Sequence, residues 1–256
     1  MQTDEGLSNP PGLKAAACPA NAATRKDDAS MTGYEARRIA MVESQLRPNA
    51  VTDKRLLDAM RTLPRERFVP PAFERLAYMD EGIEVFPAGE AGPARFLLAP
   101  MVQARLIQLA EIEPQDSVLD VGCATGYSTA VLARIAATVV GLESEPELAK
   151  AAQKTLMGLG IANAGIVSGD LTRGRAETGP YDVIVLEGSV AEVPEGLLSQ
   201  LKEGGRLVAV RTRAPNMRQG KAYLYVRVEG EASGVAQFDA GAMPLPGIAP
   251  EPAFTF

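Results

Sequence analysis

The sequence predicts an α/β fold built on an open, mostly parallel sheet. After Pro114, short runs of apolar and β-branched residues alternate with stretches that have a helical period. These runs are apolar almost throughout, as expected for strands that are buried on both faces of a sheet. With 256 residues, of which 46% are hydrophobic, the chain is long enough to form one sizeable core.

The apolar runs predict seven strands. Two of them, at about 222–228 and 233–239, flank the polar segment 229–232 and predict a C-terminal antiparallel hairpin. The other five are expected to be parallel and to alternate with helices at about 127–136, 145–159 and 194–202. These five strands are predicted at residues 117–121, 138–142, 164–167, 181–186 and 206–210.

We expect one domain over residues 31–256, in which the sheet begins at residue 114. Residues 31–113 predict a helical cap and a substrate loop. Its helices are expected at residues 34–45, at residues after a capping Thr52 or Asp53, and at about 100–111.

Two segments of the chain lack a helical or strand period. Residues 79–99 are rich in glycine and proline and predict an irregular loop. Residues 1–30 combine prolines with small and polar residues, which predicts a disordered tail.

The composition argues against several classes of protein. The chain has no histidine, which excludes Ser-His-Asp and Cys-His sites and removes the commonest metal ligand, so no metal site is predicted. A net charge of −6 argues against nucleic-acid binding. No apolar run approaches the roughly 20 residues that a membrane span requires. Cys18 and Cys123 are not expected to form a disulfide, and the cytoplasm is the expected location.

A glycine-rich turn follows the first parallel strand. Small residues stand at Gly122, Ala124 and Gly126, and a helix is expected to begin at Tyr127. A dinucleotide site of the form G-x-G-x-x-G needs its third small residue at the position of Tyr127. Here the third glycine comes one place earlier, which is the spacing typical of an S-adenosyl-L-methionine site.

Acidic residues follow the next strands at the same edge of the sheet. Glu143 is expected to accept hydrogen bonds from the ribose hydroxyls, and Asp170 to accept one from the adenine amino group. Each acid taken alone is equally compatible with a solvated loop, and the prediction depends on their order at consecutive strand ends. The predicted cofactor-binding residues are Asp120, Gly122, Ala124, Gly126, Glu143, Ser144, Asp170, Leu171 and Glu187.

Five further segments make the chain similar to the protein-L-isoaspartate O-methyltransferases. The resemblance implies a Rossmann-like methyltransferase fold with a seven-stranded sheet. It also implies that S-adenosyl-L-methionine is the cofactor and that the substrate is a protein or peptide, methylated on the carboxylate of its isoaspartyl residues. The matching segments are residues 41–47, 56–60, 64–70, 191–198 and 201–208.

Two positions depart from the pattern of this family. Leu98 stands where the family carries a serine that is expected at the reacting carboxylate. Glu187 replaces a small, uncharged residue and is expected to repel an anionic substrate. Arg95 is a candidate anchor for a substrate carboxylate, or else a solvated loop residue.

Three functions therefore stay open, and no catalytic residue is assigned. The first is an isoaspartyl methyltransferase with a modified substrate loop. The second is a methyltransferase of the same fold with another acceptor, for which Glu187 is a candidate base or a ligand for a cationic group. The third is a non-catalytic regulatory protein that binds the cofactor. The oligomeric state stays open as well.

Overall fold

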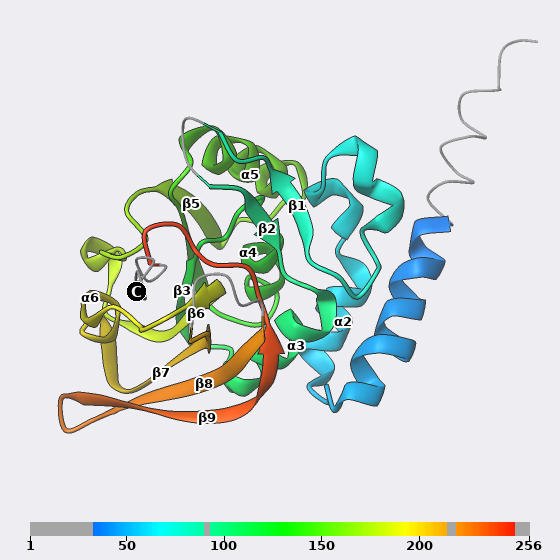
Figure 1. Ribbon diagram of the computed structural model, residues 1–256. Coiled ribbons are helices and arrows are strands. Elements are labelled where there is room, and N and C mark those ends of the chain that lie inside the picture. The colour runs from blue at the N-terminus through cyan, green and yellow to red at the C-terminus, as the bar shows by residue number, and fades with distance from the viewer. Residues whose placement is uncertain (1–32, 90–92, 214–218, 249–256) are drawn as a thin grey trace, which may run out of the picture.

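A seven-stranded sheet in the order β5-β4-β3-β6-β7-β8-β9 forms the centre of the computed structural model (Figure 1). The structure describes residues 33–89, 93–213 and 219–248, so the predicted tail at 1–30 lies outside them. The first five strands in this order are parallel, and β8 and β9 are antiparallel to their neighbours. The strands are β3 (Ser117–Val121), β4 (Thr138–Glu143), β5 (Ala164–Ser168), β6 (Tyr181–Val190), β7 (Leu201–Arg211), β8 (Gln219–Val228) and β9 (Glu231–Gly241).

The predicted fold class is confirmed: it is an α/β Rossmann-like methyltransferase fold with a C-terminal hairpin. The hairpin turn is shorter than the predicted segment 229–232, because β9 already begins at Glu231. Glu229 and Gly230 both have positive φ angles, 54° and 84°. Two central residues with positive φ give the turn a twist that matches the two strands.

Helices cover both faces of the parallel strands. They are α3 (Pro100–Leu109), α4 (Tyr127–Leu132), α5 (Pro146–Gly158) and the short α6 (Glu195–Leu198), with a 3₁₀ turn η5 (Ala176–Thr178). The helix predicted at 194–202 is wrong after Leu198, because Leu201 pairs with Tyr181 as the start of β7. The helix predicted at 127–136 also ends earlier, at Leu132.

The N-terminal cap contains more strand than the sequence predicts. Residues 33–41 are helical and continue into η1 (Val42–Leu46), η2 (Arg47–Asn49), α2 (Lys54–Thr62), η3 (Arg65–Phe68) and η4 (Pro71–Leu76). The prediction of an irregular loop at 79–99 is wrong in part. This segment contains an antiparallel pair, β1 (Ile83–Phe86) and β2 (Arg95–Leu97), which is separate from the main sheet.

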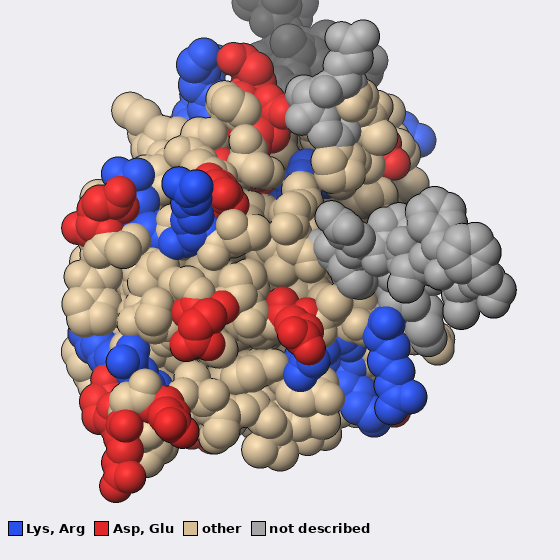
Figure 2. All heavy atoms as spheres, turned by 60° about the vertical axis from the view of Figure 1, so that its left-hand side comes forward, with Lys and Arg blue, Asp and Glu red and all other residues tan. Residues whose placement is uncertain are grey.

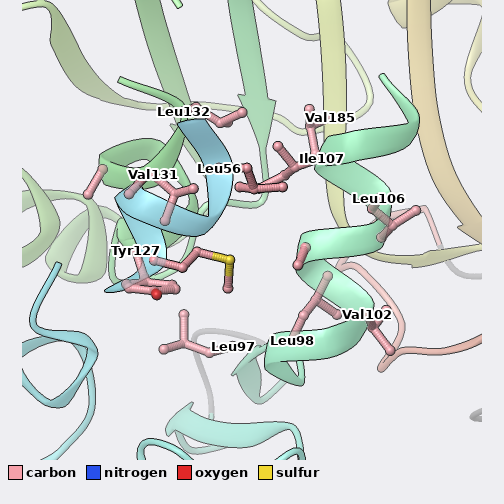
Figure 3. Packing of buried hydrophobic residues seen from close by; sticks show 14 of the residues in the cluster. Leu56, Leu97, Leu98, Val102, Leu106, Ile107, Tyr127, Val131, Leu132 and Val185 are labelled. Atoms are coloured by element: carbon pink, nitrogen blue, oxygen red, sulfur yellow. The ribbon is translucent and has the colours of Figure 1, made fainter. Parts of the chain in front are cut away.

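Side chains of the cap and the sheet share one hydrophobic cluster (Figure 3). Leu56 of α2, Ile107 of α3 and Val131 of α4 lie there together with Val185 of β6, and each is at most 1% exposed. Leu98 belongs to the same cluster and is 4% exposed. The alternate residues of β6, such as Ile184, face a second cluster on the other side of the sheet. Burial on both faces explains why the strands are apolar throughout.

The surface carries charges of both signs. On the face shown in Figure 2, lysines and arginines lie among aspartates and glutamates rather than in one separate patch. Within the residues that the structure describes, no helix is both long and apolar enough to cross a membrane.

Asp53 is the N-cap of α2, and its loss is expected to destabilise the protein. Its carboxylate accepts hydrogen bonds from the backbone N–H groups of Arg55 (2.8 Å) and Leu56 (3.4 Å). Asp53→Ala should lower the free energy of unfolding by about 1 kcal/mol, measured by urea denaturation. Asp58→Ala, an exposed change in the same helix, is the control and should be near neutral. Equal losses in the two variants would contradict the capping role.

Candidate functional site

The glycine-rich turn links the end of β3 to the start of α4. Gly122, Ala124 and Gly126 have φ angles of 77°, 49° and 87°, a region that glycine enters more easily than other residues. The N–H of Gly122 donates to the carbonyl of Leu142 on β4 (2.8 Å). The turn is therefore a fixed backbone surface at the carboxyl edge of the sheet, where open α/β sheets bind their ligands.

Asp120 is buried beneath this turn and connects β3 to α4. One of its oxygens, Oδ2, accepts hydrogen bonds from the hydroxyls of Ser128 (2.7 Å) and Thr129 (2.6 Å). The other oxygen, Oδ1, has no hydrogen-bond partner among the residues that the structure describes. Burial, with a further contribution from the charge of Glu143, raises the pKa of Asp120 to about 7. Asp120 thus fixes the first turn of α4 and keeps one oxygen available.

Glu143 at the end of β4 is fully buried and is paired with Arg95. Arg95 Nε donates to Glu143 Oε1 (3.0 Å), and Arg95 Nη2 donates to Glu143 Oε2 (2.9 Å). The N–H groups of Ala124, Ser144 and Glu145 and the hydroxyl of Ser144 also donate to this carboxylate. Burial acts to raise the pKa of Glu143, but Arg95 and the backbone donors outweigh it and hold the pKa below its ordinary value.

Arg95 is not a solvated loop residue. It lies on β2, is 3% exposed and also donates through Nη2 to the carbonyl of Gly122 (2.9 Å). The carboxylate that it anchors in this structure is Glu143 of its own chain, 48 positions along the sequence. The sequence offers Arg95 as a candidate anchor for a substrate carboxylate, but it does not point to Glu143 as its partner.

Asp170 and Leu171 follow β5. Asp170 is exposed, and its Oδ1 accepts hydrogen bonds from the N–H (2.8 Å) and hydroxyl (2.7 Å) of Thr172. These hydrogen bonds lower its pKa. Leu171 is 1% exposed and packs in the cluster on the second face of the sheet.

Glu187 near the end of β6 lies in the interior. Its Oε2 accepts a hydrogen bond from Gln103 Nε2 of α3 (2.7 Å). Burial, together with the nearby charge of Asp120, raises the pKa of Glu187 to about 8. Burial thus favours the uncharged form of this acid, and in that form it would not repel an anionic substrate.

Arg65 is a buried cation that sequence reasoning did not single out. It donates to the carbonyls of Ala77 (2.8 Å) and Leu98 (2.6 Å) and to Gln103 Oε1 (3.3 Å). Its guanidinium also stacks on the ring of Tyr127, 4.6 Å from the centroid. Arg65 thus connects the cap to the turn, and through Gln103 to the acid on β6. Its complete burial is a property of the fold that no local pattern predicts.

The raised pKa of Glu187 makes stability depend on pH. The folded protein keeps this proton up to about pH 8, whereas an unfolded glutamate releases it near pH 4.3. Between these values the folded state binds more protons, so stability falls as the pH rises. Glu187→Gln removes this pH-dependent loss of stability. The Tm of the variant relative to that of the wild type should therefore rise steadily from about pH 5 to pH 8.

Thermal unfolding followed by circular dichroism over that pH range checks this prediction. Each kcal/mol regained is expected to raise Tm by about 2–4 °C. Exposed Glu195→Gln is the matched control, and its Tm should follow that of the wild type. A constant difference between Glu187→Gln and the wild type at all pH values would contradict the raised pKa.

Known proteins of one family match this chain along most of its length. The family of protein-L-isoaspartate(D-aspartate) O-methyltransferases (PCMT) matches residues 36–230. A protein-L-isoaspartate O-methyltransferase of Koribacter versatilis is 39% identical over 178 residues, which cover 70% of this chain and 78% of the relative. A protein-L-isoaspartate O-methyltransferase 2 of Anaeromyxobacter sp. is 38% identical over 200 residues, 78% of each chain.

Solved structures agree with these matches. A protein-L-isoaspartate O-methyltransferase superposes with a TM-score of 0.71 at 27% identity, covering 83% of this chain and 67% of the other. A Plasmodium falciparum structure of this description, in complex with S-adenosyl-L-homocysteine, has a TM-score of 0.62 at 20% identity and covers 80% and 95%, so it supports the fold. The chain belongs to the protein-L-isoaspartate(D-aspartate) O-methyltransferase family.

Proposed function

We propose that this chain transfers the methyl group of S-adenosyl-L-methionine to the carboxylate of isoaspartyl residues in proteins or peptides. One observation carries the proposal within this family. At one edge of the sheet, the glycine turn follows β3, Glu143 ends β4, Asp170 follows β5, and Glu187 lies near the end of β6. Ligands of open α/β sheets bind outside that edge.

The residue types at this edge fit the cofactor. The backbone from Gly122 to Gly126 would lie against it, Glu143 would accept from the sugar hydroxyls, and Asp170 would accept from the adenine amino group. The free Oδ1 of Asp120 is a further buried acceptor. When bound, the cofactor supplies a methyl group on a sulfonium, which is a good leaving group.

The conformation described here leaves Glu143 no capacity for a sugar. Its two oxygens already accept six hydrogen bonds from the chain. Two of the six hydrogen bonds come from Arg95, which must withdraw before two sugar hydroxyls can replace it.

The absence of histidine is compatible with this reaction. A carboxylate is ionised at neutral pH and needs no general base to become a nucleophile. One of its oxygens forms the new bond to the methyl carbon while the bond from that carbon to sulfur breaks. The chain therefore has to place the carboxylate in line with the methyl group and exclude water.

Leu98 favours a second candidate function, methyl transfer to a different acceptor. It stands where the family resemblance calls for a serine, and its side chain packs in the hydrophobic cluster. An aliphatic side chain makes no hydrogen bond to a substrate carboxylate. If the chain methylates isoaspartyl residues, another group must orient the carboxylate.

Protein repair is the role that isoaspartyl methylation implies for this chain. We place that role in the cytoplasm, because two cysteines in 256 residues suit a reducing compartment.

A methyl-transfer assay tests the proposed function. The full chain is incubated with methyl-labelled S-adenosyl-L-methionine and either an isoaspartyl peptide or the same peptide with ordinary aspartate. Base-labile label is expected in the isoaspartyl peptide alone. Equal labelling of both peptides, or label only in other acceptors, would favour the second candidate. Cofactor binding with no transfer to any acceptor would favour a regulatory protein.

Leu98→Ser introduces the serine that the family resemblance calls for, and it is also expected to destabilise the protein. Because Leu98 is buried, its truncation should lower the free energy of unfolding by about 2–5 kcal/mol. Leu76→Ser, at a position that is 43% exposed, is the matched control and should be nearly neutral. Urea denaturation measures both variants. A near-neutral Leu98→Ser would contradict the burial, and increased isoaspartyl turnover in the folded variant would support the first candidate.

A further inference from the structure

Residues 242–248, here called the C-terminal strap, cover the glycine turn. Figure 1 shows this segment in red, where it leaves β9 and turns back across the sheet. Leu245 of the strap is 1% exposed. A methyl group placed on Gly122 would lie 2.5 Å from Leu245 Cδ2, and one placed on Gly188 would lie 2.7 Å from the same atom. Leu245 is therefore in close contact with the backbone surface that a cofactor would use.

Two backbone hydrogen bonds attach the strap to the sheet within residues 33–89, 93–213 and 219–248. The N–H of Ser189 donates to the carbonyl of Met243 (2.8 Å), and the N–H of Leu245 donates to the carbonyl of Ser189 (2.9 Å). Pro244 and Pro246, on either side of Leu245, have no N–H to donate. The strap thus adds one short parallel bridge beside the end of β6. Segments held by few backbone hydrogen bonds can open locally without global unfolding.

Arg95 occupies the neighbouring part of the same surface, next to Glu143. Its two hydrogen bonds to Glu143 equal in number those that two ribose hydroxyls would make. Arg95 comes from β2, whose partner is β1 and not the main sheet, so the arginine can leave the acid without breaking a strand pair of the sheet. Its positive charge lowers the pKa of Glu143 and, to a smaller extent, acts against the raised pKa of Glu187.

We propose that this chain blocks its own cofactor site with Arg95 and Leu245, and that S-adenosyl-L-methionine binds in competition with both. This inference rests on the proposed function. Arg95 takes the place of the sugar at Glu143, and Leu245 takes the place of the group that lies against Gly122. A cationic cofactor replaces a cationic arginine among three acids, so the exchange preserves the charge balance of the site.

Competition predicts that weakening the block tightens cofactor binding. Leu245→Ala and Arg95→Gln both destabilise the blocked conformation more than the open one. Titration calorimetry with S-adenosyl-L-methionine should give a Kd at least tenfold lower for each variant than for the wild type. The matched controls are Leu201→Ala, in the same hydrophobic cluster, and Arg206→Gln, which loses an ion pair to Asp116. Both controls lie toward the opposite edge of the sheet and should keep the wild-type Kd.

Hydrogen exchange on the unmodified chain gives a second readout. The amides of Ser189 and Leu245 should be protected in the free protein and exchange at least tenfold faster when S-adenosyl-L-homocysteine is bound. Unchanged protection together with equal Kd values in all proteins would overturn the inference. If methyl transfer to the isoaspartyl peptide persists in that case, the proposed function stands without it. If no protein of the set binds the cofactor, the inference and the proposed function both fail.

Discussion

The buried ion pair between Arg95 and Glu143 is the interaction on which the arrangement of the site depends. It joins β2 of the cap, the glycine turn after β3 and the residue directly before α5, Glu145. Charges are costly to bury unless every polar atom is satisfied, and one partner left alone is strongly destabilising. Arg95 can therefore leave only when another set of donors replaces it. The position of β2 is thus coupled to whether a ligand is bound at the carboxyl edge of the sheet.

The buried charged residues Arg65, Asp120 and Glu187 interact with one another less directly than Arg95 does with Glu143. Arg65 reaches Glu187 through Gln103, while Asp120 has hydroxyl donors on only one oxygen. Within the described part of the chain no cation forms an ion pair with Asp120 or Glu187, so burial dominates, and both acids have raised pKa values. The site thus contains one ionised acid with a fixed partner and two acids that are easily protonated. Such a set favours a cationic ligand over a second anion.

Much of the fold could be predicted because parallel strands buried on both faces have a distinctive composition. The strand at Ser117–Val121 has the predicted bounds, and the hairpin of β8 and β9 lies where the polar segment indicates. The predictions that failed depend on pairing between distant residues. Leu201 leaves its predicted helix because it pairs with Tyr181, and residues 83–97 contain strands because they pair with each other. Local patterns do not contain such partners.

By itself, the sequence determined which chemical groups stand at the ends of consecutive strands: a glycine turn, then Glu143, Asp170 and Glu187. The position of each strand along the chain follows from local composition, because each strand has to bury its own residues. Only the tertiary structure decided the partners of these groups. Arg95 reaches Glu143 and Leu245 reaches Gly122 from segments far away in the chain. Their contacts form because the completed sheet edge offers a buried acid and a bare backbone surface, and neither exists before the chain has folded.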